Sequence, residues 1–207
     1  MSSPLPELAV FDLDMCCWSP EMYSLSVVPD ASKDAVRGKL NENGDEGVVG
    51  VKSGREVIAL FPDALKVLQA FHEGKYPGMR IAAASSADTP LAVRIGRTAL
   101  GILEVAPGVT VRQVFATGWP EGFEGNMQIG RSPPLSAHKN KSHFPLIKQH
   151  TGIEYNQMLF FDDCNWSDNV AEVERGCPGV VGVRTPNGLQ WDEWVRGLQL
   201  FAARQGR

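Results

Sequence analysis

Short apolar runs, each bounded by polar residues or glycine, recur along the chain. They cover residues 8–11, 81–84, 111–115, 158–161 and 180–183. Runs of this length are typical of strands that are buried on both faces of a parallel sheet. We therefore predict a strand at each of these five places.

Segments with a helical spacing of apolar residues lie between these runs. They cover residues 62–74, 89–100, 144–150 and 191–203. Pro62 and Asp88 stand where helices can begin, and Gly74, Gly101 and Gly152 stand where helices can end. Strands that alternate with helices predict an α/β fold, a Rossmann-like parallel sheet flanked by helices.

Two stretches interrupt this alternation. Residues 29–56 are rich in glycine, asparagine and charge, with weak strand patterns at 48–51 and 57–60, which predicts a hairpin or a flexible insertion. Residues 104–137 hold several prolines and glycines, so we expect a second insertion with much loop in its latter half. Neither stretch is long enough to form a second domain, and we expect one domain over residues 1–207.

Composition excludes several classes of protein. Of 207 residues, 43% are hydrophobic and 21% charged, and the net charge of −4 gives no basic surface for nucleic acid or anionic lipid. We see no signal peptide and no apolar run of about 18 residues, so we expect no membrane segment. Four cysteines without zinc spacing indicate reduced thiols in a cytoplasmic protein.

Acidic residues follow two of the predicted strands directly. Asp12 and Asp14 come after the first strand, and Asp162 and Asp163 come after the fourth. Ligands of open parallel sheets bind beyond the carboxyl ends of the strands, so these acids should meet at one edge. Carboxylates packed so closely repel unless a cation neutralises them, and histidine-free oxygen donors favour Mg²⁺.

Hydroxyl groups follow another strand of the predicted sheet. Ser85 and Ser86 come directly after the run at 81–84, where hydroxyls and free backbone N–H groups could hold phosphate oxygens, or could simply cap a turn. A lysine near the last acidic pair would balance the acids and bind phosphate as a point charge. Lys139, Lys141 and Lys148 are the candidates, and the residues alone leave the choice open.

The order of these motifs resembles that of the haloacid dehalogenase superfamily of phosphatases. Within it, residues 7–100 and 138–204 look like the small magnesium-dependent phosphatase family. The resemblance rests on Leu8–Asp14 with Trp18, on Ala82–Ser85, on Lys141–Phe144 and on Gln157–Asn165.

The resemblance implies a role for each motif. Asp12 would be the nucleophile and a metal ligand, and Asp14 the general acid and base, ligating the metal through its backbone carbonyl. Ser85, with Ser86 beside it, would bind the phosphoryl group. Lys141 is selected as the lysine because Ser142-His143-Phe144 follows it. Asp163 would be the main metal ligand of the last motif, with Asp162 beside it.

One position departs from the family pattern, and one supports phosphate chemistry. Cys16 stands where the family usually has threonine or valine, so a hydroxyl hydrogen bond would be weakened there. A true dehalogenase needs no proton donor at the position of Asp14, so this residue favours a phosphate ester as substrate.

We therefore expect a Mg²⁺-dependent phosphomonoester hydrolase that acts through an aspartyl-phosphate intermediate. Its substrate would be a phosphoprotein, such as one bearing phosphotyrosine, or a phosphorylated small molecule such as a phosphosugar. The alternative is a catalytically weak protein that keeps this fold as a binding or regulatory module.

Residues 15–61 are too polar to build a core of their own, so we expect a hairpin in place of a cap domain and an active site open to solvent.

Overall fold

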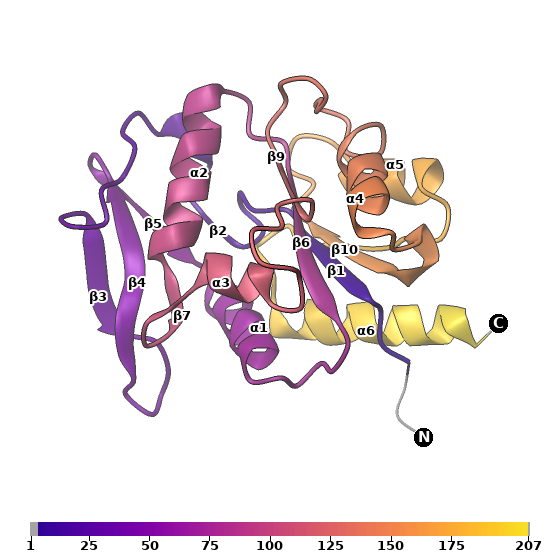
Figure 1. Ribbon diagram of the computed structural model, residues 1–207, viewed down its shortest axis with the longest axis horizontal. Helices are drawn as coiled ribbons and strands as arrows, with labels where there is room; N and C mark the ends of the chain where they lie inside the picture. The colour runs from indigo at the N-terminus through magenta and orange to yellow at the C-terminus, as the bar shows by residue number, and fades with distance from the viewer. Residues whose placement is uncertain (1–3, 207) are drawn as a thin grey trace.

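The computed structural model describes residues 4–206, and a parallel five-stranded sheet lies at its centre (Figure 1). The strand order is β11–β10–β1–β6–β9. The strands are β1 (Leu8–Phe11), β6 (Arg80–Ser85), β9 (Met127–Ile129), β10 (Met158–Asp162) and β11 (Val181–Arg184). The first, second, fourth and fifth match apolar runs in the sequence, which confirms the predicted α/β fold.

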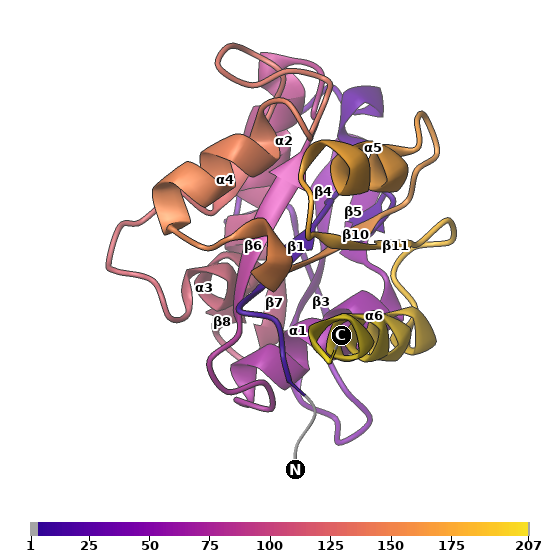
Figure 2. The ribbon, with the colours of Figure 1, turned by 90° about the vertical axis from the view of Figure 1, so that its right-hand side faces the viewer.

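Helices cover both faces of this sheet. They are α1 (Pro62–His72), α2 (Pro90–Ile102), α3 (Val111–Ala116), α4 (His143–Thr151), α5 (Asn169–Gly176) and α6 (Trp191–Gln205). Leu8 and Val10 pack with α4 and α5, whereas Ala9 and Phe11 pack with the remaining helices. Figure 2 shows β10 and β11 running between α5 on one side and α6 on the other. Alternate residues of one strand therefore serve two separate cores.

A second, antiparallel sheet is built from the stretch that was expected to form a hairpin. Its order is β2–β5–β4–β3. The strands are β2 (Trp18–Ser19), β3 (Ala35–Lys39), β4 (Glu46–Ser53) and β5 (Glu56–Leu60). A small hairpin of β7 (Glu104–Ala106) and β8 (Val109–Thr110) lies against it, because Glu104 Oε2 accepts a hydrogen bond of 3.0 Å from the backbone N–H of Val48. Two 3₁₀ helices, η1 (Met22–Ser24) and η2 (Tyr155–Gln157), complete the elements.

The structure corrects the prediction for residues 111–115, which form α3 and not a strand. Thr110 caps this helix, and its side chain exchanges hydrogen bonds with Gln113 in a capping box. Val111, Val114 and Phe115 are buried at helical spacing. The three apolar residues among these five positions fit one face of a helix as well as a strand, and the capping box at Thr110 decides between the two.

Residues 104–137 are also less of an insertion than expected, because β9 belongs to the central sheet. This strand has three residues with Gln128 in the middle, so no apolar run marks it.

In α2, the helix cap is Thr89 and not Asp88, and the helix continues through Gly101 to Ile102. Within residues 4–206, no helix combines the length and the apolar character that crossing a membrane requires.

Candidate active site

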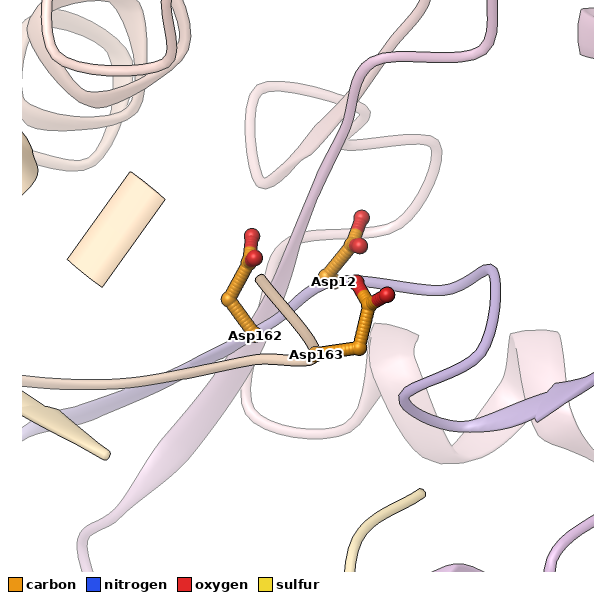
Figure 3. Close-up of side chains that lie close together, drawn as sticks. All are labelled: Asp12, Asp162 and Asp163. Atoms are coloured by element: carbon orange, nitrogen blue, oxygen red, sulfur yellow. The ribbon is translucent and has the colours of Figure 1, made fainter. Parts of the chain in front are cut away.

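Three carboxylates meet at the carboxyl ends of β1 and β10 (Figure 3). Asp12 directly follows β1, Asp162 ends β10, and Asp163 comes next. The backbone N–H of Asp12 donates to the carbonyl oxygen of Phe161 at 2.9 Å, which holds the two strand ends in register. Asp12, Asp162 and Asp163 each offer an oxygen within 4.8 Å of the others. The sequence prediction that these acids lie together at one sheet edge is thus confirmed.

The lysine at these acids is Lys139, and the choice of Lys141 is corrected. Lys139 Nζ lies 2.8 Å from Asp12 Oδ1 and 2.6 Å from Asp162 Oδ2, with 2% of its side chain exposed. Lys141 is exposed. A turn explains the difference: Lys141 N donates to His138 O, and Lys139 O accepts from Phe144 N at the start of α4. Lys139 is thereby turned inward and Lys141 outward.

The buried charges at this cluster do not balance. The three carboxylates outnumber the one ammonium by two when all are ionised. Burial and then the charges of Asp162 and Asp163 raise the pKa of Asp12, although Lys139 opposes this. Burial and then Asp162 raise the pKa of Asp163 as well. Burial alone would lower the pKa of Lys139. The negative charges of Asp12 and Asp162 outweigh this effect and raise the pKa above its ordinary value. A divalent cation would restore the balance.

The donor set fits Mg²⁺, which prefers carboxylate oxygens. Asp162 is fully buried, and its oxygens already accept from Lys139, from Cys164 N at 2.9 Å and from the Asn169 amide. Asp163 Oδ2 accepts from Asn165 N at 3.2 Å. Among residues 4–206, no hydrogen bond reaches Asp12 Oδ2 or Asp163 Oδ1. Asp12 and Asp163 are therefore the residues with oxygen to offer, and Asp162 anchors the lysine.

Asp14 lies at the same edge but turns its carboxylate toward η1. Its Oδ1 accepts from Trp18 Nε1 at 2.8 Å, and its Oδ2 accepts from the backbone N–H of Met22 at 2.9 Å. Burial raises the pKa of Asp14 to about 6, while these two hydrogen bonds work against the shift. Only its backbone carbonyl is left for a metal, and its side chain can exchange a proton near neutral pH.

Ser85 and Ser86 stand at the end of β6, as expected. The carbonyl oxygen of Ser85 accepts from Gly130 N at 2.9 Å and lies 3.0 Å from His143 Nε2. Ser86 Oγ is buried and has no hydrogen-bond partner among residues 4–206. An orphaned hydroxyl is costly unless a ligand oxygen completes it, which fits a phosphate oxygen here.

A cleft of about 310 Å³ joins these groups. Asp12, Asp14, Asp163, Ser85 and Ser86 all line it. Further lining residues come from outside the predicted motifs: Glu21, Tyr23, Ala87, Asp88, Arg131, Ala137, Trp166, Ser167 and Asn169. The strands β3, β4 and β5 contribute no residue to the lining, so the second sheet does not cover the cleft.

Arg131 is a cleft residue that the sequence reading missed. Its Nε donates to the carbonyl oxygen of Ser86 at 2.7 Å. The residue lies in a proline-rich loop, in a stretch that was read as an insertion, and no sequence pattern marks it. Trp166 and Tyr23 were missed as well, although Trp166 lies only three residues after Asp163.

Two cysteines lie in the turn that follows Asp12. Cys17 Sγ donates to the carbonyl oxygen of Asp12 at 3.1 Å. At the departure from the family pattern, Cys16 Sγ accepts from Thr185 Oγ1 at 3.4 Å. The partner hydroxyl is thus supplied by the residue that follows β11. Cys16, Cys17, Cys164 and Cys177 are all free thiols, as expected.

Comparison with known proteins gives concordant matches. A family model described as Acid Phosphatase matches residues 4–204. Human "Magnesium-dependent phosphatase 1" is 27% identical over 201 residues, which cover 97% of this chain and 90% of that protein.

Solved structures with a similar fold include two bacterial proteins. The N-terminal part of BF1531 from Bacteroides fragilis, which contains a phosphatase domain complexed with Mg, aligns over 95% of this chain and 41% of its own, with 16% identity and a TM-score of 0.46. CbbY from Rhodobacter sphaeroides, in complex with phosphate, aligns over 87% of each chain with 13% identity and a TM-score of 0.47.

Proposed function

Because the chain belongs to the acid phosphatase family, we propose that it is a Mg²⁺-dependent phosphomonoester hydrolase that acts through an aspartyl-phosphate on Asp12. The observation that carries this proposal is that Asp12, which is paired with buried Lys139, lines one cleft together with Asp163 and with Ser86, whose hydroxyl has no partner among residues 4–206. The name of the human relative supports the choice of metal.

In the proposed mechanism, Asp12 is the nucleophile of the first half-reaction. One of its oxygens attacks phosphorus, the bond from phosphorus to the ester oxygen breaks, and Asp14 gives that oxygen its proton. Lys139 offsets the repulsion between the carboxylate and the phosphoryl oxygens, and Ser86 donates to one of those oxygens. Asp12, Asp163 and the backbone carbonyl of Asp14 would hold Mg²⁺, which would supply further positive charge.

The second half-reaction returns the enzyme to its starting state. Asp14, now ionised, takes a proton from water as the water oxygen attacks phosphorus. The bond between phosphorus and Asp12 breaks, and inorganic phosphate leaves with Asp14 protonated again. A pKa of about 6 suits a group that must both give and accept a proton near neutral pH.

The substrate is a phosphoprotein, with phosphotyrosine as one candidate, or a phosphorylated small molecule such as a phosphosugar. A cleft of about 310 Å³ has room for a phosphoryl group with part of its alcohol, and a larger remainder would stay in solvent. The residues around the cleft, and not a separate cap domain, then contact the leaving group.

Phosphate release from a panel of phosphorylated metabolites and phosphopeptides, with Mg²⁺ or with EDTA, tests the proposal. We expect turnover only with Mg²⁺, and Asp12→Asn should abolish it. Trapping of a phosphorylated protein by rapid quenching should succeed for the wild type and fail for Asp12→Asn. Full activity in EDTA, or no activity on any substrate, would contradict the proposal; the second result would favour a binding or regulatory protein.

A further inference from the structure

The wall of the cleft carries an excess of negative charge. Within residues 4–206, its lining includes five carboxylates, those of Asp12, Asp14, Glu21, Asp88 and Asp163. Arg131 is the one basic residue in that lining. A phosphate ester is itself an anion, and a wall with this charge repels it. The ligand therefore gains most from the one cationic side chain that it can touch.

The ammonium group of Lys139 is engaged elsewhere. Its Nζ lies 2.8 Å from Asp12 Oδ1 and 2.6 Å from Asp162 Oδ2, and the residue is not part of the cleft lining. Its charge favours an anion near Asp12, but its contacts are to the two carboxylates. The cationic side chain that reaches the open cleft is Arg131.

Two hydrogen bonds anchor the segment that presents Arg131. Gly130 N donates to Ser85 O at 2.9 Å, and Arg131 Nε donates to Ser86 O at 2.7 Å. Among residues 4–206, no hydrogen bond or ion pair engages the Nη atoms of Arg131. The guanidinium group is thus held at one edge by its Nε contact, and its two Nη atoms are left for a ligand.

The Ser86 hydroxyl provides a second unused donor at the same place. Ser86 Oγ is buried and unpartnered among residues 4–206, and the carbonyl of the same residue holds Arg131. A guanidinium fork matches the spacing of two phosphate oxygens, and a hydroxyl can donate to a third. Both groups line the cleft together with Asp12.

We propose that Arg131 binds the phosphoryl group of the substrate through its Nη atoms, beside the hydroxyl of Ser86. This inference rests on the proposed phosphatase function and deepens it. Arg131 then supplies the direct cationic contact, while Lys139 neutralises the carboxylates around the nucleophile. Because the contact is to the phosphoryl group and not to the alcohol, it acts on every ester and on inorganic phosphate alike.

Steady-state kinetics, with inorganic phosphate as inhibitor, tests this proposal. Wild type, Arg131→Ala and Arg131→Lys would be compared on p-nitrophenyl phosphate with saturating Mg²⁺. We expect Arg131→Ala to raise both the KM of the ester and the inhibition constant of phosphate roughly 10-fold, because each loses one charge-assisted contact. The kcat should stay within about 3-fold, since ground state and transition state lose the contact together. Arg131→Lys keeps the charge without the fork and should recover part of the loss.

Chemical rescue adds a readout that depends on the missing group itself. Guanidinium ion, added to Arg131→Ala far below the concentrations that unfold proteins, should lower the inhibition constant of phosphate again. Sodium chloride at the same ionic strength should not, because it only screens charge.

Arg55→Ala is the matched control, because it removes the same charge from an exposed turn between β4 and β5, outside the cleft lining. It should change neither KM nor the inhibition constant. Values for Arg131→Ala within about 2-fold of the wild type would overturn the proposal. A fall in kcat alone would also overturn it, since Arg131 would then act only by holding Ser86. A wild type that releases no phosphate from this ester or from the wider panel would overturn the proposed function itself.

Discussion

Lys139 holds its ammonium group between the carboxylates of Asp12 and Asp162 and is almost fully buried. Removing a preorganised charge from such a site costs roughly 10²–10³-fold in rate. We therefore predict that Lys139→Ala lowers kcat by that factor, whereas Lys141→Ala keeps activity within about 2-fold. Phosphate release under saturating substrate measures both. Equal activity of the two variants would contradict the assignment of the lysine.

The two lysines also show why sequence alone could not select the right one. Both stand shortly before α4, and the residues after Lys141 fit the family pattern. The decision depends on the turn at His138–Lys141 and on a long-range ion pair to Asp162. Neither is visible as a local pattern. The acids and serines, in contrast, could be predicted, because each directly follows an apolar run that becomes a buried strand.

His143 gives a second residue-scale prediction, for stability against pH. Its Nδ1 lies 3.1 Å from Ser142 Oγ and its Nε2 lies 3.0 Å from Ser85 O, so the neutral ring links the lysine loop to β6. Burial and then the charge of Lys139 lower the pKa of His143 from 6.5 to about 4. The unfolded chain therefore takes up a proton near pH 6.5 that the folded protein does not bind until about pH 4.

Because of this difference, His143 contributes less to the stability of the folded protein as the pH falls. The contribution of His143 to stability is complete above pH 6.5 and is lost as the pH falls toward 4, by roughly 3 kcal/mol in all. Urea unfolding between pH 4.5 and 7.5 measures this effect as the difference in slope between the wild type and His143→Gln, because Asp14, whose pKa is raised to about 6, contributes an opposite slope to both. Exposed His72→Gln serves as the control and should keep the wild-type slope. An unchanged slope in His143→Gln would refute the assignment.

At the scale of elements, α3 depends on its first turn. Thr110 and Gln113 form a capping box, and a helix of six residues is too short to be stable by itself. Thr110→Ala should lower the free energy of unfolding by about 1 kcal/mol, whereas Thr110→Ser should retain most of it. Urea unfolding midpoints compare the three proteins. A wild-type midpoint for Thr110→Ala would show that packing alone holds the helix.

The elements that sequence reading placed well are those whose burial is uniform. The residues of β1, β6 and β10 are almost all buried, so their apolar runs are continuous. β9 lies at the sheet edge, has three residues and includes Gln128, whose amide donates to Gly125 O. Its pairing to β6 is a tertiary effect without a local signal. The apolar residues of segment 111–115 fit both the helical and the strand period, and the capping box at Thr110 decides for the helix.

At the scale of the whole molecule, the Acid Phosphatase family model matches residues 4–204, which confirms the resemblance to phosphatases drawn from the motifs. Residues 15–61, expected to form only a hairpin, instead build the four-stranded second sheet, which packs against the main core. β2 joins it to the first turn after β1, and Val51 and Ile58 belong to the main core. The cleft is bounded instead by segments that follow β1, β6, β9 and β10.

Mg²⁺ should stabilise the whole protein, because its site joins the ends of two central strands whose separation accompanies global unfolding. At a concentration 100 times the dissociation constant, a ligand of the folded state adds about 2.7 kcal/mol, which a thermal unfolding scan detects as a higher midpoint. We predict such a shift for the wild type and none for Asp163→Asn.

Without metal, Asp163→Asn should unfold at a higher temperature than the wild type, because burial and the charge of Asp162 oppose ionisation of Asp163. Asp45→Asn, an exposed change in the turn between β3 and β4, should leave the Mg²⁺ shift intact. A Mg²⁺ shift that survives in Asp163→Asn would place the metal elsewhere.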